Sequence, residues 1–123
     1  MADEFVIQIH SDYGPLHYDL MLARGGVLAT WQLTVSPAEL AEGQETRAKR
    51  LKGHRLEYLT YEGPVSKGRG RVAILDKGTF ELLDEQDDRW RIRLDGQIVR
   101  GTFELRRLCG SADEWTISCL HAA

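Results

Sequence analysis

The chain has 123 residues, 42% hydrophobic and 28% charged, which is enough for one domain with its own core. Its formal net charge of −3 argues against a protein that coats nucleic acid, and no apolar run approaches the ~20 residues of a membrane span. The acidic N-terminus differs from a signal peptide, and Cys109 and Cys119 lack CxxC spacing. We therefore expect a single domain over residues 1–123 in a reducing, cytoplasmic setting, with one disulfide as the alternative.

Most of the secondary structure is predicted by period-two alternation and by short runs rich in β-branched and aromatic residues. The predicted strands cover residues 5–10, 16–22, 27–35, 71–75, 79–83, 89–94, 102–108 and 115–120. Turn signals separate them, including Ser11–Pro15, Asp76–Gly78 and Asp95–Gly96. About eight short strands favour a mostly β fold, either a small antiparallel β-barrel or a sandwich.

The chain after the third of these strands has the sequence features of a short helix followed by a polar loop. Ser36 and Glu39 form a capping box around Pro37, which predicts a short helix that ends before Gly43. Residues 43–55 are polar and are expected to form a loop or a broken helix. We therefore expect one or two short helices at the periphery of the barrel.

Two histidines and an aspartate near the N-terminus have a spacing that suits a metal site. His17 and Asp19 are two residues apart, so they share a face of a strand. The turn Ser11–Pro15 folds the chain back, which would bring His10 beside them. Two imidazoles and a carboxylate suit Mn²⁺, Fe²⁺ or Zn²⁺ and leave positions open for water or substrate. The alternative is that these side chains are solvated or cap the turn, and the spacing alone does not decide.

Basic residues are concentrated between Arg47 and Arg71. This segment holds eight lysines and arginines, opposed only by Glu57 and Glu62. Such an asymmetry favours a face that attracts a phosphate-bearing ligand. A solvated basic loop is the alternative.

Four motifs follow one another along the chain. They are FVIQIH with LHYD at residues 5–19, GVLATW at residues 26–31, HRLEYLTYEG at residues 54–63, and an element ending in DKGTFE at residues 70–81. Together they resemble the 3′-phosphoesterase domain family of bacterial DNA ligase D, which also includes stand-alone small proteins. The similarity extends over nearly the whole chain in a consistent order, so it is far more specific than the metal-ligand spacing.

The resemblance implies a small β-barrel with a metal site and a phosphate site. The implied Mn²⁺ ligands, with zinc or iron as alternative metals, are His10, His17 and Asp19. The implied catalytic residues at the scissile phosphate are His54 and Tyr58, and Gln8 would line the same site. The implied partners are a nucleic-acid 3′ end that carries a ribonucleotide or a phosphate, or a smaller phosphate ester, together with DNA end-joining proteins.

The sequence departs from this family at cationic positions. The family's catalytic arginine, two residues after the metal-binding aspartate, is replaced by Met21, and a family lysine is replaced by Val35. The family also has an N-terminal arm, whereas four residues precede Phe5 here. The phosphate-binding arginine that precedes the later histidine in the family corresponds to Arg47 or Arg50.

Three functions stay open. The first is a metal-dependent phosphoesterase that acts on nucleic-acid 3′ ends with a rearranged set of cations, drawn from Arg24, Arg47, Lys49 or Arg50. The second is a catalytically impaired module that keeps the metal and recognises a phosphate, a strand end or a protein, since losing one charge-stabilising contact typically costs ~10²–10³ in rate. The third is a His-His-Asp mononuclear iron enzyme, which the whole-chain resemblance disfavours.

Overall fold

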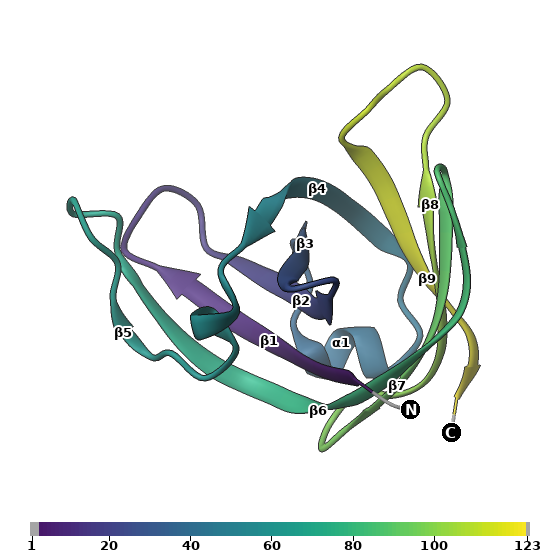
Figure 1. The fold of residues 1–123 in the computed structure, drawn as a ribbon, viewed down its shortest axis with the longest axis horizontal. Helices are drawn as coiled ribbons and strands as arrows, with labels where there is room; N and C mark the ends of the chain where they lie inside the picture. The colour runs from purple at the N-terminus through teal and green to yellow at the C-terminus, as the bar shows by residue number, and fades with distance from the viewer. Residues whose placement is uncertain (1–2, 123) are drawn as a thin grey trace.

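The computed structural model describes residues 3–122, and most of them lie in antiparallel strands (Figure 1). The strands are β1 (Asp3–Ser11), β2 (His17–Arg24), β3 (Val27–Leu33), β4 (Thr46–His54), β5 (Gly63–Pro64), β6 (Arg71–Gln86), β7 (Arg89–Gly96), β8 (Arg100–Arg107) and β9 (Glu114–Ala122). The helical elements are α1 (Pro37–Ala41) and the 3₁₀ turn η1 (Leu56–Leu59). Within residues 3–122, neither helical element has the length and apolar character needed to cross a membrane.

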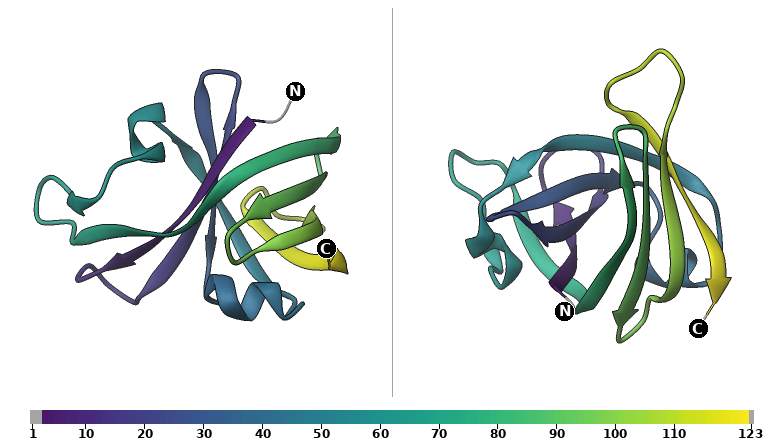
Figure 2. Two further views of the ribbon diagram at one scale, coloured as in Figure 1. Left: turned by 90° about the horizontal axis from the view of Figure 1, so that it is seen from below. Right: turned by 45° about the vertical axis from the view of Figure 1, so that its right-hand side comes forward.

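The strands form one sheet that closes on itself. Their order is β1-β2-β3-β4-β9-β8-β7-β6-β5, and β1 also pairs with β6, which completes the ring. The 16-residue strand β6 pairs with β1 through its first part and with β7 through its second part, as Figure 2 shows. The predicted small antiparallel β-barrel with short peripheral helices is therefore confirmed.

The prediction of a loop or broken helix over residues 43–55 is wrong for most of that range. Residues 46–54 form β4, which pairs with β3 on one side and with β9 on the other. Ala48 is fully buried, but four of the nine residues of the strand are lysine or arginine, and its sequence shows little apolar alternation. Pairing with two neighbouring strands satisfies the backbone of β4, and this tertiary context outweighs the weak strand propensity of its sequence.

The turn predicted at Asp76–Gly78 is also wrong, because these residues lie inside β6. The side chain of Asp76 is buried, and its carboxylate accepts hydrogen bonds from the backbone N–H groups of Gln97 and Val99, both at 2.8 Å. Asp76 therefore stabilises the turn between β7 and β8. Gly96 makes room for this carboxylate, since a Cβ at that position would lie 2.6 Å from Asp76 Oδ2.

The helix α1 begins with the predicted capping box. Ser36 Oγ accepts a hydrogen bond from the backbone of Glu39 at 3.2 Å, and Glu39 Oε1 accepts one from the backbone of Ser36 at 3.0 Å. Both groups satisfy N–H groups that a helix end leaves without partners. Leu40 then inserts its side chain into the barrel core, where it is fully buried.

Three tryptophans lie at the centre of that core. Trp31, Trp90 and Trp115 are buried, and Trp31 meets the other two rings edge to face at centroid distances of 5.1 and 5.7 Å. Such aromatic pairs add about 0.5–1.5 kcal/mol beyond the burial of their area. Ile92 and Leu94 follow Trp90 at intervals of two residues on β7 and are also buried, so this strand presents one face to the core.

A second, smaller apolar cluster lies on the opposite, outer face of β1, β2 and β3. Val6, Met21 and Leu28 are each at most 1% exposed there, and Tyr58 and its neighbour in η1 pack against them. Because side chains alternate along a strand, Gln8, two residues after Val6 on β1, and Asp19, two residues before Met21 on β2, share this outer face. The cluster therefore fixes η1 beside those polar residues.

Candidate functional site

The three predicted metal ligands converge on the β1–β2 hairpin. His10 lies directly opposite His17 in the strand pair, and one potential ligand atom from each of His10, His17 and Asp19 lies within 4.8 Å of the others. The turn that joins the strands places Asp12 and Gly14 at φ values of 62° and 68°, in the left-handed region. Glycine adopts this region without strain and aspartate does so more readily than most residues, which suits the turn composition.

Backbone carbonyls orient both histidines. His17 Nδ1 donates to the Pro15 carbonyl oxygen at 3.2 Å, so its Nε2 faces Asp19. His10 Nε2 donates to the Arg69 carbonyl oxygen at 2.6 Å, which leaves its Nδ1 free to bind. Metal-binding histidines commonly donate their second ring nitrogen to such an acceptor, because this fixes the tautomer and the ring orientation.

The carboxylate of Asp19 is the strongest sign that a cation fits here. Asp19 Oδ1 is buried and has no hydrogen-bond partner among residues 3–122, and His17 Nε2 is 3.6 Å away. An unpartnered buried carboxylate oxygen is costly, and a divalent ion would compensate it. The approach of Asp19 raises the pKa of His17 against the lowering effect of burial, so a metal would take the place of a proton between these two groups. Two imidazole nitrogens and one carboxylate oxygen therefore fit a divalent transition-metal ion.

A pocket of about 460 Å³ opens beside this triad. His10 and Asp19 contribute to its wall, and so do His54 from β4 and Tyr58 from η1. The two segments that carry the implied metal ligands and the implied phosphate contacts are thus adjacent in space. Tyr13, from the β1–β2 turn, also lines the pocket and stacks on His10 with ring centroids 6.0 Å apart.

The ring of His54 is held with one nitrogen free. Its Nδ1 lies 3.0 Å from the Lys52 carbonyl oxygen and 3.1 Å from Thr30 Oγ1. Because a carbonyl oxygen only accepts, Nδ1 carries a proton, and Nε2 is left to accept or donate at the pocket. The rings of His54 and Tyr58 meet edge to face at 5.9 Å, so they act as neighbours on one wall.

Gln8 connects this wall to the barrel. Its side chain is 1% exposed, and its amide nitrogen donates to the carbonyl oxygens of Tyr58 at 2.8 Å and Tyr61 at 3.0 Å. Both amide protons are therefore used to hold η1 and the residues that follow it. Gln8 lies at the pocket, as its place in the motif implies, and it positions Tyr58 there.

The structure does not bring Arg47 or Arg50 to this pocket. Arg47 pairs with Glu114 on the exposed surface, at 3.4 Å. The guanidinium of Arg50 lies over the rings of Trp31, Trp90 and Trp115, with its carbon 4.7 to 5.5 Å from their centroids. Burial among these rings lowers the pKa of Arg50, against a raising effect of Glu85. The remaining proposed replacements, Arg24 and Lys49, are also absent from the pocket wall.

A β-bulge in β4 explains why Arg50 and His54 point to different faces. Thr30 pairs with Leu51, whereas Leu28 pairs with His54, so β4 carries one extra residue between these pairs. Regular alternation would place His54 on the same face as Arg50. The extra residue moves it to the outer face of the barrel, at the pocket. Bulges often redirect side chains in this way next to functional sites.

Three basic residues that are absent from the predicted site line the pocket, namely Lys52, Arg55 and Arg69. All three belong to the basic segment between Arg47 and Arg71. The charge of that segment was the only feature of the sequence that could have indicated them. Within the part of the chain that the structure describes, Asp19 supplies the only carboxylate of the pocket wall. The pocket is therefore electropositive, as a phosphate site requires.

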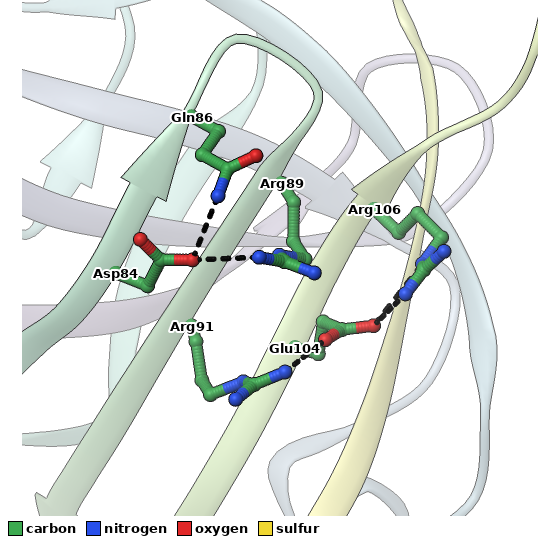
Figure 3. A network of polar contacts seen from close by, with 6 residues as sticks. All are labelled: Asp84, Gln86, Arg89, Arg91, Glu104 and Arg106. Atoms are coloured by element: carbon green, nitrogen blue, oxygen red, sulfur yellow. Dashed lines mark hydrogen bonds and ion pairs between the residues drawn. The ribbon is translucent and has the colours of Figure 1, made fainter.

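The arginines of β7 and β8 form a different kind of surface. Figure 3 shows Asp84 bound to Arg89, and Glu104 bound to Arg91 and Arg106, with distances of 2.8 to 3.0 Å. Burial tends to raise the pKa of Glu104, but its hydrogen bonds to the two arginines outweigh this and lower it. The charges of this face compensate one another, so it is a structural ion network.

Comparison with known proteins identifies the family of this chain. Residues 8–107 match the family described as the DNA ligase D 3′-phosphoesterase domain. The chain is 35% identical to the multifunctional non-homologous end joining protein LigD of Mycobacterium bovis, over 93% of this chain and 15% of that protein. It is 34% identical to LigD of Mycolicibacterium smegmatis over 84% of the chain and 15% of that protein, and 29% identical to LigD of Pseudomonas aeruginosa over 90% and 14%.

The chain thus corresponds to about one seventh of the length of these curated relatives. The matched residues include Gln8, all three triad residues, His54 and Tyr58. Both the identity to these relatives and the family match extend across the barrel strands that build the pocket. The chain belongs to the DNA ligase D 3′-phosphoesterase domain family.

Proposed function

We propose that this protein is a metal-dependent phosphoesterase that acts on nucleic-acid 3′ ends bearing a ribonucleotide or a phosphate. The observation that carries the proposal is the convergence, in one electropositive pocket, of a His-His-Asp triad with His54 and Tyr58. The relatives are named for non-homologous end joining, and we place this chain in the same DNA-repair context, with nucleic-acid ends and end-joining proteins as its partners.

His10, His17 and Asp19 would hold the metal, with Mn²⁺ preferred and zinc or iron as alternatives. When bound, the ion supplies Lewis-acid polarisation of a phosphoryl oxygen. Asp19 gains the partner that its buried oxygen lacks, and the carbonyl groups of Pro15 and Arg69 keep the two imidazoles oriented toward the ion. This arrangement costs little reorganisation, because the hairpin already brings the ligand atoms together.

His54 and Tyr58 would act on the phosphate itself. His54 holds its Nδ1 proton on the Lys52 carbonyl, so its Nε2 is the atom that moves a proton to or from a phosphate oxygen. The Tyr58 hydroxyl donates a hydrogen bond to a non-bridging oxygen, and Gln8 holds the backbone of Tyr58 in position for that contact.

A second function is favoured by Met21. This residue stands where the family has its catalytic arginine, and it is buried in the apolar cluster beneath η1. A thioether neutralises no charge on a phosphoryl group, so the family reaction loses a contribution of about 10²–10³ unless another cation supplies it. The alternative function is therefore a module that binds a metal and a phosphate-bearing end but turns it over slowly or not at all.

The test is a labelled primer–template with a 3′-ribonucleotide, a 3′-phosphate or a plain 3′-hydroxyl, incubated with Mn²⁺-loaded protein. We expect product only from the first two substrates, and loss of product with His17→Ala but not with His121→Ala, whose histidine is exposed and lies outside the pocket. Specific end binding without product supports the binding module. Turnover of a simple aryl phosphate at a similar rate argues for small esters instead. Dioxygen consumption with ferrous iron indicates the iron enzyme.

A further inference from the structure

The three cations of the pocket, Lys52, Arg55 and Arg69, differ in whether they have an acidic partner. Arg55 pairs with Glu57 at 3.2 Å, and its side chain is 80% exposed. Arg55 therefore already has an acidic neighbour, although so exposed a pair is weak. Lys52 and Arg69 line the same pocket, and neither forms an ion pair with a carboxylate among residues 3–122. These two charges are the ones available to a ligand.

Lys52 owes its position to the bulge in β4. It lies between the pairs Thr30–Leu51 and Leu28–His54, in the segment that carries the extra residue. Gly53 lets this segment pack closely, because a Cβ there would lie 2.6 Å from a side-chain carbon of Val27. The bulge thus places Lys52 and His54 at one pocket although both follow Arg50, which faces the tryptophans.

Arg69 is held in place from both ends. Its Nε and Nη2 donate to the carbonyl and hydroxyl oxygens of Ser66, each at 2.9 Å, which leaves Nη1 for another partner. Its own carbonyl oxygen accepts the hydrogen bond from His10. Gly70 has a φ of 79°, and a Cβ there would lie 2.1 Å from the Ser11 carbonyl oxygen, so glycine is needed for the chain to approach β1 at this point. The guanidinium is therefore pre-positioned beside the triad.

We propose that Lys52 and Arg69 together clamp the terminal phosphate of the ligand, and that they supply the charge compensation that Met21 does not. The ligand class rests on the proposed function, but the clamp requires only binding and no turnover. A lysine provides a compact charge that adapts to the phosphate, whereas a fixed guanidinium defines its orientation. Lys52 and Arg69 line the same pocket as His54 and Tyr58. A phosphate bound between the two cations would therefore also lie near His54 and Tyr58.

The experiment measures dissociation constants of two single-stranded oligonucleotides of the same sequence, one ending in a 3′-phosphonate, which mimics the 3′-phosphate but is not hydrolysed, and one in a 3′-hydroxyl, with Mn²⁺-saturated protein. We expect the wild type to prefer the 3′-phosphonate. Lys52→Met and Arg69→Met should each reduce that preference about ten- to a hundredfold, the usual effect of losing a hydrogen bond to a charged group. Lys52→Arg should retain most of it. Lys77→Met is the matched control, because Lys77 is exposed on β6 and outside the pocket.

Two further readouts distinguish a lost phosphate contact from a damaged metal site. Mn²⁺ affinity, titrated without oligonucleotide, should be unchanged in Lys52→Met, which shows that the triad is intact. The salt dependence of binding should become less steep by about 0.7 in the slope of log K against log salt, as expected for one lost phosphate contact on a single strand. An unchanged preference in both Lys52→Met and Arg69→Met overturns the clamp. A clamp that behaves as expected in a protein that yields no product instead counts against the proposed enzyme.

Discussion

Asp76 offers a sharp test of what holds the barrel together, separate from its function. This carboxylate is 1% exposed and accepts four backbone N–H groups, from Lys77, Gln97, Ile98 and Val99, at 2.8 to 3.2 Å. Three of these donors belong to the turn between β7 and β8. The turn residues therefore depend on a side chain some twenty positions earlier in the chain, and removing it leaves their N–H groups without a protein acceptor.

The size of the effect follows from those bonds. The two contacts at 2.8 Å, from Gln97 and Val99, are well formed, and hydrogen bonds to charged groups are worth about 1.5–3 kcal/mol each. Water replaces part of the loss at Gln97, which is exposed, but not at Val99, which is fully buried. We therefore expect Asp76→Ala to reduce the free energy of unfolding by about 3–5 kcal/mol, a large share of the 5–15 kcal/mol typical of a domain.

The assay is urea unfolding followed by tryptophan fluorescence, since Trp31, Trp90 and Trp115 lie in the core. Asp95→Asn is the matched control on the same hairpin. Asp95 pairs with Arg100 at 3.3 Å, both side chains are more than 60% exposed, and such a pair contributes only about 0–1 kcal/mol. A loss below 1 kcal/mol for Asp76→Ala, or an equal loss for both variants, would refute the reasoning.

Three more predictions concern the site and the ion network. The arginines around Glu104 lower its pKa below the ordinary value of 4.5. The contribution of Glu104 to the free energy of unfolding is therefore fully present above pH 4.5 and is lost as the pH falls through the lowered pKa. We expect Glu104→Gln to flatten the decline in the free energy of unfolding that is measured below about pH 5. Asp19→Asn should weaken Mn²⁺ binding at least tenfold in a calorimetric titration, because it removes the charged ligand. Gln8→Leu should lower kcat with unchanged Mn²⁺ affinity, because it releases the backbone of Tyr58.

The clustering of the His-His-Asp triad was predictable because it is local. His10, His17 and Asp19 lie within ten residues of one another, and a turn plus period-two alternation is enough to bring them together. The strand content and the capping box were predictable for the same reason. Strand β4 and the continuous β6 were not, because both depend on neighbours far away in the sequence: β4 on β3 and β9, and β6 on β1 and β7.

The rest of the pocket wall depends on two features that no local pattern shows. One is the bulge in β4, which separates Arg50 from His54, and the other is the approach of Arg69 to His10 from the segment before β6. A basic segment in the sequence indicates the charge of a site but not which of its residues face that site. One extra residue in a strand moves every later side chain to the opposite face of the sheet.

The same geometry gives a physical role to Met21. On the outer face of β1 and β2, the positions next to the pocket are polar and the positions beyond them are apolar, and η1 covers the apolar end. Met21 belongs to the apolar end, where Tyr58 packs against its cluster. If the pocket binds a phosphate, as we propose, the charge that balances it comes from other residues of the pocket. Lys52 and Arg69 line the pocket without acidic partners among residues 3–122, and the clamp that we propose would therefore compensate for the arginine that Met21 replaces.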